Sequence, residues 1–263
     1  MGFRSICGIS DVCGRAVRGA GVDCVHLWSG NAQAGRWGEQ MNSGFYNMDC
    51  MEAMKQFPDG FFDLAIVDPV YGDVTKGGYM THNRGQHIGK GLANSKGYHA
   101  GLWNQQKTGA EYFSELRRVS NNQIIWGGNY FADILPASQG WIVWDKEHPG
   151  GMTFADCEMA WTSFNRATRL FKYMWNGMIQ GNMKNKENRI HPTQKPVALY
   201  NWILKNYAHK GDKILDTHVG SASSLIACHR AGLEYWGFEI DPVYYANAKE
   251  RLDKELAQVR MDL

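Results

Sequence analysis

The feature that most constrains the fold is a strand, turn and helix followed by a second strand within residues 213–240. Residues 213–215 form a short apolar strand pattern, a Gly-Ser turn follows, and residues 223–231 have a helical pattern. Residues 235–240 then return to a strand pattern. Strands that alternate with helices in this way predict an open, mostly parallel α/β sheet.

The same alternation extends over most of the chain from Gly44 onward. The last helix is expected to begin after Asp241 and to bury a stripe of every fourth residue: Tyr244, Ala248, Leu252 and Leu256. The other predicted helices cover residues 50–57, 110–119 and 196–208, and the other predicted strands cover residues 64–67, 123–127, 141–144 and 158–162.

Composition indicates a globular protein, because 44% of the 263 residues are hydrophobic and 21% are charged. No apolar run is long enough for a membrane span, and the N-terminus lacks a secretion signal pattern. The cysteines form no C-x-x-C pair, so we predict reduced thiols, no metal site and a cytoplasmic location. We predict one α/β domain over residues 44–263, preceded by a segment (1–43) of unknown role. Residues 73–109, rich in Gly, Asn, His and Lys, are expected to form a mobile loop.

The turn inside the 213–240 unit has the features of a nucleoside-binding site. Asp216 ends the first strand, and Gly220 and Ser221 place backbone N–H groups and the positive end of a helix at the carboxyl edge of the sheet. About 20 residues further on, Glu239 and Asp241 end the next strand, where an acidic side chain typically accepts hydrogen bonds from ribose hydroxyls. The turn lacks a second close-approach glycine, so S-adenosylmethionine fits better than a nicotinamide cofactor. The alternative is an ordinary turn with a solvated acid at its end.

A second motif, Asp68-Pro69-Val70-Tyr71, follows the strand predicted at 64–67. The Asp68 carboxylate and the Pro69 carbonyl can accept the two N–H bonds of an exocyclic amine, which favours a pyramidal nitrogen whose lone pair points at a methyl donor. Tyr71 would stack on a flat base, a contact worth about 1–3 kcal/mol. Such a base cannot be reached within a duplex, so it must be flipped out. The motif predicts in-line methyl transfer through proximity and orientation, unless Asp68-Pro69 merely ends a strand.

Together these motifs resemble the amino-group DNA methyltransferases of the β arrangement, in which the catalytic motif precedes the cofactor motif. The resemblance covers residues 44–256 and includes residues 46–54 and the hexapeptide His191-Pro192-Thr193-Gln194-Lys195-Pro196. It implies a Rossmann-like S-adenosylmethionine-dependent methyltransferase fold, with a mostly parallel sheet flanked by helices and a circularly permuted motif order. It also implies that Asp49 lies near the cofactor's adenine. The other residues that it assigns to the cofactor pocket are Thr193, Lys195, Asp216, Gly220, Ser221 and Glu239. Residues 125–130 resemble phage or prophage members.

Three positions depart from the family's usual motifs. Val70 replaces the second proline of Asp-Pro-Pro-Tyr, and Ala222 replaces a glycine of the cofactor motif. His218 replaces an apolar or aromatic residue that packs near the cofactor, so it either contacts the cofactor or is a satisfied histidine at a strand end. These changes bear on rate and cofactor affinity more than on fold.

In the β arrangement the target-recognition segment lies between the two motifs, which here leaves the short, basic stretch 165–190. Contacts to phosphate would position DNA without specifying its sequence. A solvated surface is the alternative interpretation of the same charges. The resemblance implies DNA as the partner and no membrane, and leaves a homodimer open. The candidate phosphate contacts are Arg166, Arg169, Lys172, Lys184 and Lys186.

Our leading hypothesis is methylation of adenine N6 in DNA, because Asp at the first motif position points to adenine more often than to cytosine in this family. Cytosine N4 is the close second. A cytosine-C5 enzyme is disfavoured, because no Pro-Cys dipeptide supplies its nucleophile. A catalytically weakened DNA-binding relative is a different class. So is a methyltransferase of RNA or protein amides, although those usually carry Asn in place of Asp68.

Overall fold

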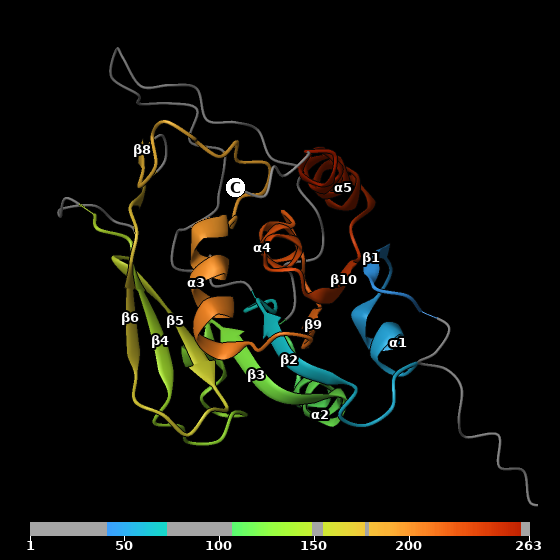
Figure 1. Cartoon of the computed structure of the whole chain (residues 1–263). Coiled ribbons are helices and arrows are strands. Elements are labelled where there is room, and N and C mark those ends of the chain that lie inside the picture. Colours follow the sequence, from blue (N-terminus) through green and yellow to red (C-terminus); the bar gives the residue numbers. More distant parts are fainter. Residues whose placement is uncertain (1–40, 73–106, 149–154, 177–178, 259–263) are drawn as a thin grey trace, which may run out of the picture. The chain divides into compact units, whose positions relative to one another are not determined.

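The computed structural model describes residues 41–72, 107–148, 155–176 and 179–258, all within the unit Arg36–Leu263 (Figure 1). In this part of the chain the helices are α1 (Cys50–Met54), α2 (Ala110–Val119), the 3-10 helix η3 (Gly128–Phe131), α3 (Val197–Tyr207), α4 (Ser223–Ala231) and α5 (Pro242–Leu256). The strands are β1 (Gly44–Asn47), β2 (Phe62–Val67), β3 (Ser120–Trp126), β4 (Trp141–Asp145), β5 (Cys157–Thr162), β6 (Arg169–Lys172), β7 (Trp175–Asn176), β8 (Ile179–Gln180), β9 (Lys213–Asp216) and β10 (Glu234–Glu239).

Among the described residues, eight strands form one sheet in the order β1-β10-β9-β2-β3-β5-β4-β6. Every neighbouring pair in this sheet is parallel except the two pairs made by β5, which runs against β3 and β4. The carboxyl ends of β1, β10, β9, β2 and β3 therefore meet at one edge. β7 and β8 pair separately as a two-stranded antiparallel sheet.

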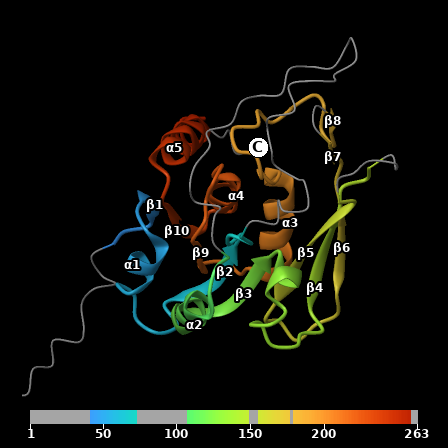
Figure 2. The same cartoon turned by 180° about the vertical axis from the view of Figure 1, so that it is seen from behind.

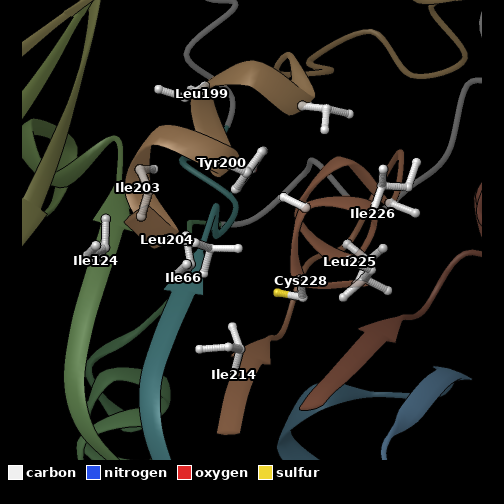
Figure 3. Close-up of a cluster of buried hydrophobic side chains, with 14 of the residues drawn as sticks. Ile66, Ile124, Leu199, Tyr200, Ile203, Leu204, Ile214, Leu225, Ile226 and Cys228 are labelled. Atoms are coloured by element: carbon white, nitrogen blue, oxygen red, sulfur yellow. The ribbon is translucent and has the colours of Figure 1, made fainter. Parts of the chain in front are cut away.

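Helices cover both faces of the sheet, and alternate residues of the central strands face opposite ways. Leu64 and Ile66 of β2 pack in the cluster that contains α3 and α4, whereas Ala65 and Val67 pack in the cluster that contains α2. Figure 3 shows the first cluster, in which Ile66, Ile124 and Ile214 lie beneath the apolar faces of α3 and α4. Both cartoon views place α3 and α4 on the opposite side of the strands from α2 (Figures 1 and 2). Because both faces are covered and side chains alternate between them, all four residues of Leu64–Val67 are buried.

The mostly parallel α/β prediction is confirmed, and most predicted elements have a counterpart. The segments 110–119 and 223–231 coincide with α2 and α4. In α5, Tyr244, Ala248 and Leu252 are buried as expected, but Leu256 is 42% exposed, so the predicted stripe is one turn too long.

Four strands were not predicted: β1, β6, β7 and β8. β1 has only four residues, and only Phe45 among them is buried. β6 has no buried residue, because it is the last strand of the sheet. Short strands with mixed exposure lack the apolar run that makes a strand visible in a sequence.

Two predicted segments lie mostly outside the described residues. They are the N-terminal segment 1–43 and the loop 73–109, of which only the last three residues are described. They stay predictions. None of the helices in the described ranges is long and apolar enough to cross a membrane.

Candidate active site

A pocket of about 830 Å³ opens at the carboxyl edge of the sheet. Ligands of open α/β sheets bind at this edge, because the loops that leave parallel strands gather there. The walls come from the segments after β1, β2, β9 and β10, together with residues 107–112 and the hexapeptide before α3. The predicted site residues that line it are Asp49, Asp68, Thr193, Lys195, His218, Gly220, Ser221 and Glu239.

Asp68 lies directly after β2, where its carboxylate meets two partners. The Tyr71 hydroxyl donates a hydrogen bond to Asp68 Oδ1, and the Lys195 ammonium contacts Asp68 Oδ2. Lys195 is buried and also lies 3.2 Å from Glu158 Oε2. Burial acts to lower the pKa of Lys195, but the carboxylates of Asp68 and Glu158 outweigh it, so the pKa is raised. The site therefore holds an ammonium between two carboxylates.

The turn after β9 is held by Glu239 at the end of β10. The backbone N–H of Gly220 donates to Glu239 Oε2 at 2.9 Å, and the N–H of Asp241 donates to Glu239 Oε1 at the same distance. Gly220 has φ of +55°, a backbone conformation that costs glycine little. Ala222 adopts a similar conformation (φ +61°) as the N-cap of α4, where the family usually has glycine. Glu239 thus ties the two strand ends together while still lining the pocket.

Two predicted cofactor residues are not among the residues that line this pocket. Asp216 is 3% exposed and accepts hydrogen bonds from the backbone N–H of His218, at 3.0 Å, and from the Ser224 hydroxyl. Asp241 caps α5 by accepting from the N–H groups of Val243 and Tyr244. Both carboxylates support the loops around the pocket, and a direct contact with a cofactor stays a prediction for each.

Two histidines line the pocket in neutral form. Burial lowers the pKa of His218 to about 4. Burial, together with the nearby Lys195 charge, lowers the pKa of His191 to about 4. The Nδ1 of His218 lies 2.9 Å from the Thr217 hydroxyl, and the Nδ1 of His191 lies 3.1 Å from the Thr193 hydroxyl. His218 is therefore a satisfied histidine at a strand end, and it also faces the pocket.

The Tyr71 ring packs away from the pocket against Gly127, at the end of β3. A Cβ added at Gly127 would lie 2.1 Å from a ring carbon of Tyr71, so the ring occupies the space that a side chain would need. Tyr130 stacks on the same ring with centroids 4.8 Å apart. Pro69 is buried. In this arrangement Tyr71 supports Asp68 through its hydroxyl, and stacking on a base stays a prediction.

The pocket fits a nucleoside that carries a positive charge. Four carboxylate residues line it (Asp49, Asp68, Glu111 and Glu239) against two lysines (Lys107 and Lys195), so a cationic centre would be stabilised among the carboxylates. Apolar side chains lie beside Asp49 and Glu239, namely Met48, Met51 and Ile240, which suits a flat base. The residues present are therefore compatible with S-adenosylmethionine.

Comparison with known proteins shows which proteins this chain resembles. The N6/N4 family model described as "DNA methylase" matches residues 138–250. The type II methyltransferase M.HpaI of Haemophilus parainfluenzae is 41% identical over 71 residues, which are 27% of this chain and 23% of that protein. M2.MboI of Moraxella bovis is 22% identical over 244 residues, which cover 81% of this chain and 88% of that protein.

Part of this chain is therefore similar to the DNA methylases of the N6/N4 family. Its fold agrees: the M1.HpyAVI–SAM complex matches with a TM-score of 0.50 and 21% identity, over 79% of this chain and 98% of that one. The cytosine-N4-specific PvuII DNA methyltransferase also reaches a TM-score of 0.50, at 13% identity, over 82% of this chain and 91% of that one. These likenesses show the Rossmann-like fold that the resemblance implied. The matched segments span 23% of M.HpaI and 31% of M2.DpnII of Streptococcus pneumoniae, so less than a third of each relative is covered.

The five basic residues predicted to contact DNA do not form one cluster. Arg166 donates to the Asn206 carbonyl near the C-terminus of α3, whereas Lys195 precedes the N-terminus of that helix. A helix of this length separates its ends by about 16 Å. Arg169 begins β6 and Lys172 ends it, while Lys184 and Lys186 are exposed in the segment that leads to Lys195. Lys172 therefore lies toward the carboxyl edge of the sheet, and Arg166 and Arg169 toward the opposite edge, while Lys186 lines a separate cavity beside α3 and α5.

Sequence reasoning missed three polar residues at the site: Lys146, Glu158 and His191. His191 lies within the hexapeptide that carried the resemblance, so its pattern was available. Glu158 is a charged residue in a strand that is otherwise mostly apolar, which is a signal in itself because a charge that is even partly buried needs a partner. Lys146 has no such signal, since a lysine after a strand is common on surfaces.

Proposed function

We propose that this protein transfers a methyl group from S-adenosylmethionine to an exocyclic amine of a base in DNA. Support comes from one observation above all: Asp68 lines the same pocket as Gly220 and Glu239, although the two motifs are far apart in the chain. In-line methyl transfer needs a group that accepts the N–H of the target amine and a nucleoside-binding turn in the same cavity. The match of residues 138–250 to the DNA methylase family model supports the same reaction class.

In this proposal Glu239 binds the ribose hydroxyls and Asp49 lies near the adenine of the cofactor, with Thr193, Gly220 and Ser221 completing the pocket wall. S-adenosylmethionine, when bound, supplies an electrophilic methyl group on a sulfonium. The neutral His191 and His218 add no positive charge beside that sulfonium, because burial keeps their pKa values near 4. With four carboxylate residues against two lysines in its wall, the pocket therefore favours a cationic ligand.

Asp68 is the proposed acceptor for one N–H of the target amine, and the Pro69 carbonyl is the proposed acceptor for the other. Acceptance of both hydrogens would localise the nitrogen lone pair for attack. Because such an amine lies inside the duplex in B-form DNA, the base is proposed to be flipped out before it reaches Asp68. The proposed aromatic face for that base is that of Tyr130, which is 45% exposed and stacks on the Tyr71 ring.

Adenine N6 is the target that we propose. The argument is the aspartate at position 68, which in this family accompanies adenine more often than cytosine. Cytosine N4 is the competing target, and a fold shared with a cytosine-N4 enzyme does not separate the two.

The decisive experiment incubates the purified protein with methyl-tritiated S-adenosylmethionine and unmethylated DNA, then digests the DNA to nucleosides for mass analysis. We expect N6-methyl-2′-deoxyadenosine from wild type and none from Asp68→Ala. The matched control is Asp253→Ala, which removes an exposed carboxylate paired with Lys249 on α5 and should leave the product unchanged. N4-methyl-2′-deoxycytidine alone would refute the adenine target. Absence of any methylated nucleoside would refute the enzyme.

A further inference from the structure

A chain of alternating charges runs from Asp68, the proposed acceptor for the target N–H, to Lys146. Lys195 contacts Asp68 on one side and Glu158 at 3.2 Å on the other, and Glu158 in turn contacts Lys146 at 2.6 Å. Asp68 follows β2, Glu158 lies in β5, and Lys146 directly follows β4. Three separate parts of the sheet therefore supply this chain of charges around one buried ammonium.

Lys195 needs both carboxylate partners because its ammonium is the most deeply buried group of this chain of charges. The side chain of Lys195 is 3% exposed, whereas those of Asp68 and Glu158 are 18% and 32% exposed. An ammonium this deeply buried needs acceptors for its three N–H donors. Two donors meet the carboxylates, and the ammonium also lies 5.2 Å from the centroid of the Trp126 ring. Lys195 therefore depends on these carboxylates, because so little of its side chain is open to water.

The same contacts leave Asp68 already engaged. Its two oxygens contact the Tyr71 hydroxyl and the Lys195 ammonium. A target amine that donates to Asp68 must share an oxygen with one of them or displace it. If Asp68 were the only carboxylate beside Lys195, displacement would leave a buried charge without a partner, which is strongly unfavourable.

We propose that Glu158 is a positioning residue for methyl transfer: it provides Lys195 with a second carboxylate, so that Lys195 can release an Asp68 oxygen to the incoming amine without losing its charge partner. Lys146 holds Glu158 in place from the far side. This inference rests on the proposed function, since it assigns a role within that same site. Glu158 does not line the cofactor pocket, so its effect is on the chemical step and not on cofactor binding.

The test compares steady-state kinetics of wild type, Glu158→Gln and Glu158→Asp. Gln keeps the shape of Glu but removes its charge, so Lys195 stays locked on Asp68. We expect kcat to fall roughly ten- to a hundredfold, as for other losses of active-site positioning. KM for S-adenosylmethionine and for DNA should change by less than about twofold, since uniform binding is kept. Asp restores the charge on a shorter stem and should recover part of kcat.

The matched control is Glu255→Gln, which removes a carboxylate that pairs with Arg230 at 2.7 Å, on the helices away from the pocket. It should keep wild-type kcat and KM. A Glu158→Gln variant with wild-type kcat would overturn the inference. So would a rise in KM for S-adenosylmethionine at unchanged kcat, or a loss of activity that Glu158→Asp does not relieve. A wild-type protein that transfers no methyl group would instead refute the proposed function.

Discussion

At the scale of a single residue, Asp216 shows how burial turns a motif residue into a pH-dependent component of the fold. Burial raises its pKa to about 7, and the hydrogen bonds from Ser224 and His218 only partly oppose this. The native state therefore favours the protonated acid, while the unfolded chain releases the proton near its ordinary value. Stability should fall as pH rises from about 4 to 7, and Asp216→Asn should remove this loss, on the order of a few kcal/mol. Urea unfolding of both proteins at several pH values measures it.

The quantity to compare is the difference in unfolding free energy between wild type and Asp216→Asn, because other groups titrate equally in both. This difference should move against wild type as pH rises through the window. A difference that is constant across this pH range and just above it would show that Asp216 ionises in the folded protein as easily as in water.

At the scale of an element, α5 contains two leucines that share its helical period but differ in burial. Leu252 is 2% exposed, whereas Leu256, one turn later, is 42% exposed. Leu252→Ala should cost about 2–5 kcal/mol of unfolding free energy through reduced burial and a cavity. Leu256→Ala is its matched control and should stay within about 0.5 kcal/mol. Equal losses in chemical denaturation would mean that the end of α5 is packed in solution.

At the scale of the whole molecule, the separation of the basic residues predicts which of them bind DNA. Lys184 and Lys186 are exposed in the segment that leads to the pocket, whereas the Arg166 guanidinium is held by the Asn206 carbonyl and by the Phe164 and Tyr207 rings. Replacing both lysines by alanine should lower the slope of log K against log salt by about 0.9 for each DNA phosphate that is no longer neutralised. Arg166→Ala should leave that slope unchanged. Fluorescence anisotropy at several salt concentrations measures the slope of each variant. A slope that changes only in Arg166→Ala would indicate that DNA binds near Arg166 instead.

Much of the fold was predictable because local patterns carry it. The apolar run at Leu64–Val67 and the helical period of 223–231 depend only on neighbouring residues, so α4 and the core of β2 could be predicted from the chain. β6 could not, because its residues are exposed and it is a strand only through its pairing with β4. Likewise Leu256 follows the helical period of α5 but is largely exposed, and the period alone does not show how far along the helix the buried face extends.

The sequence by itself determined the parallel α/β architecture and the two motifs at strand ends, since periodicity, turn residues and strand-end acids are local properties. The tertiary structure decided which of those residues meet. It buried Asp216, separated the residues of the basic stretch, and brought Lys195 against Asp68, 127 positions earlier, with Glu158 beside Lys195. Charge pairing acts through space and burial, and neither quantity is written in the spacing of residues along a chain.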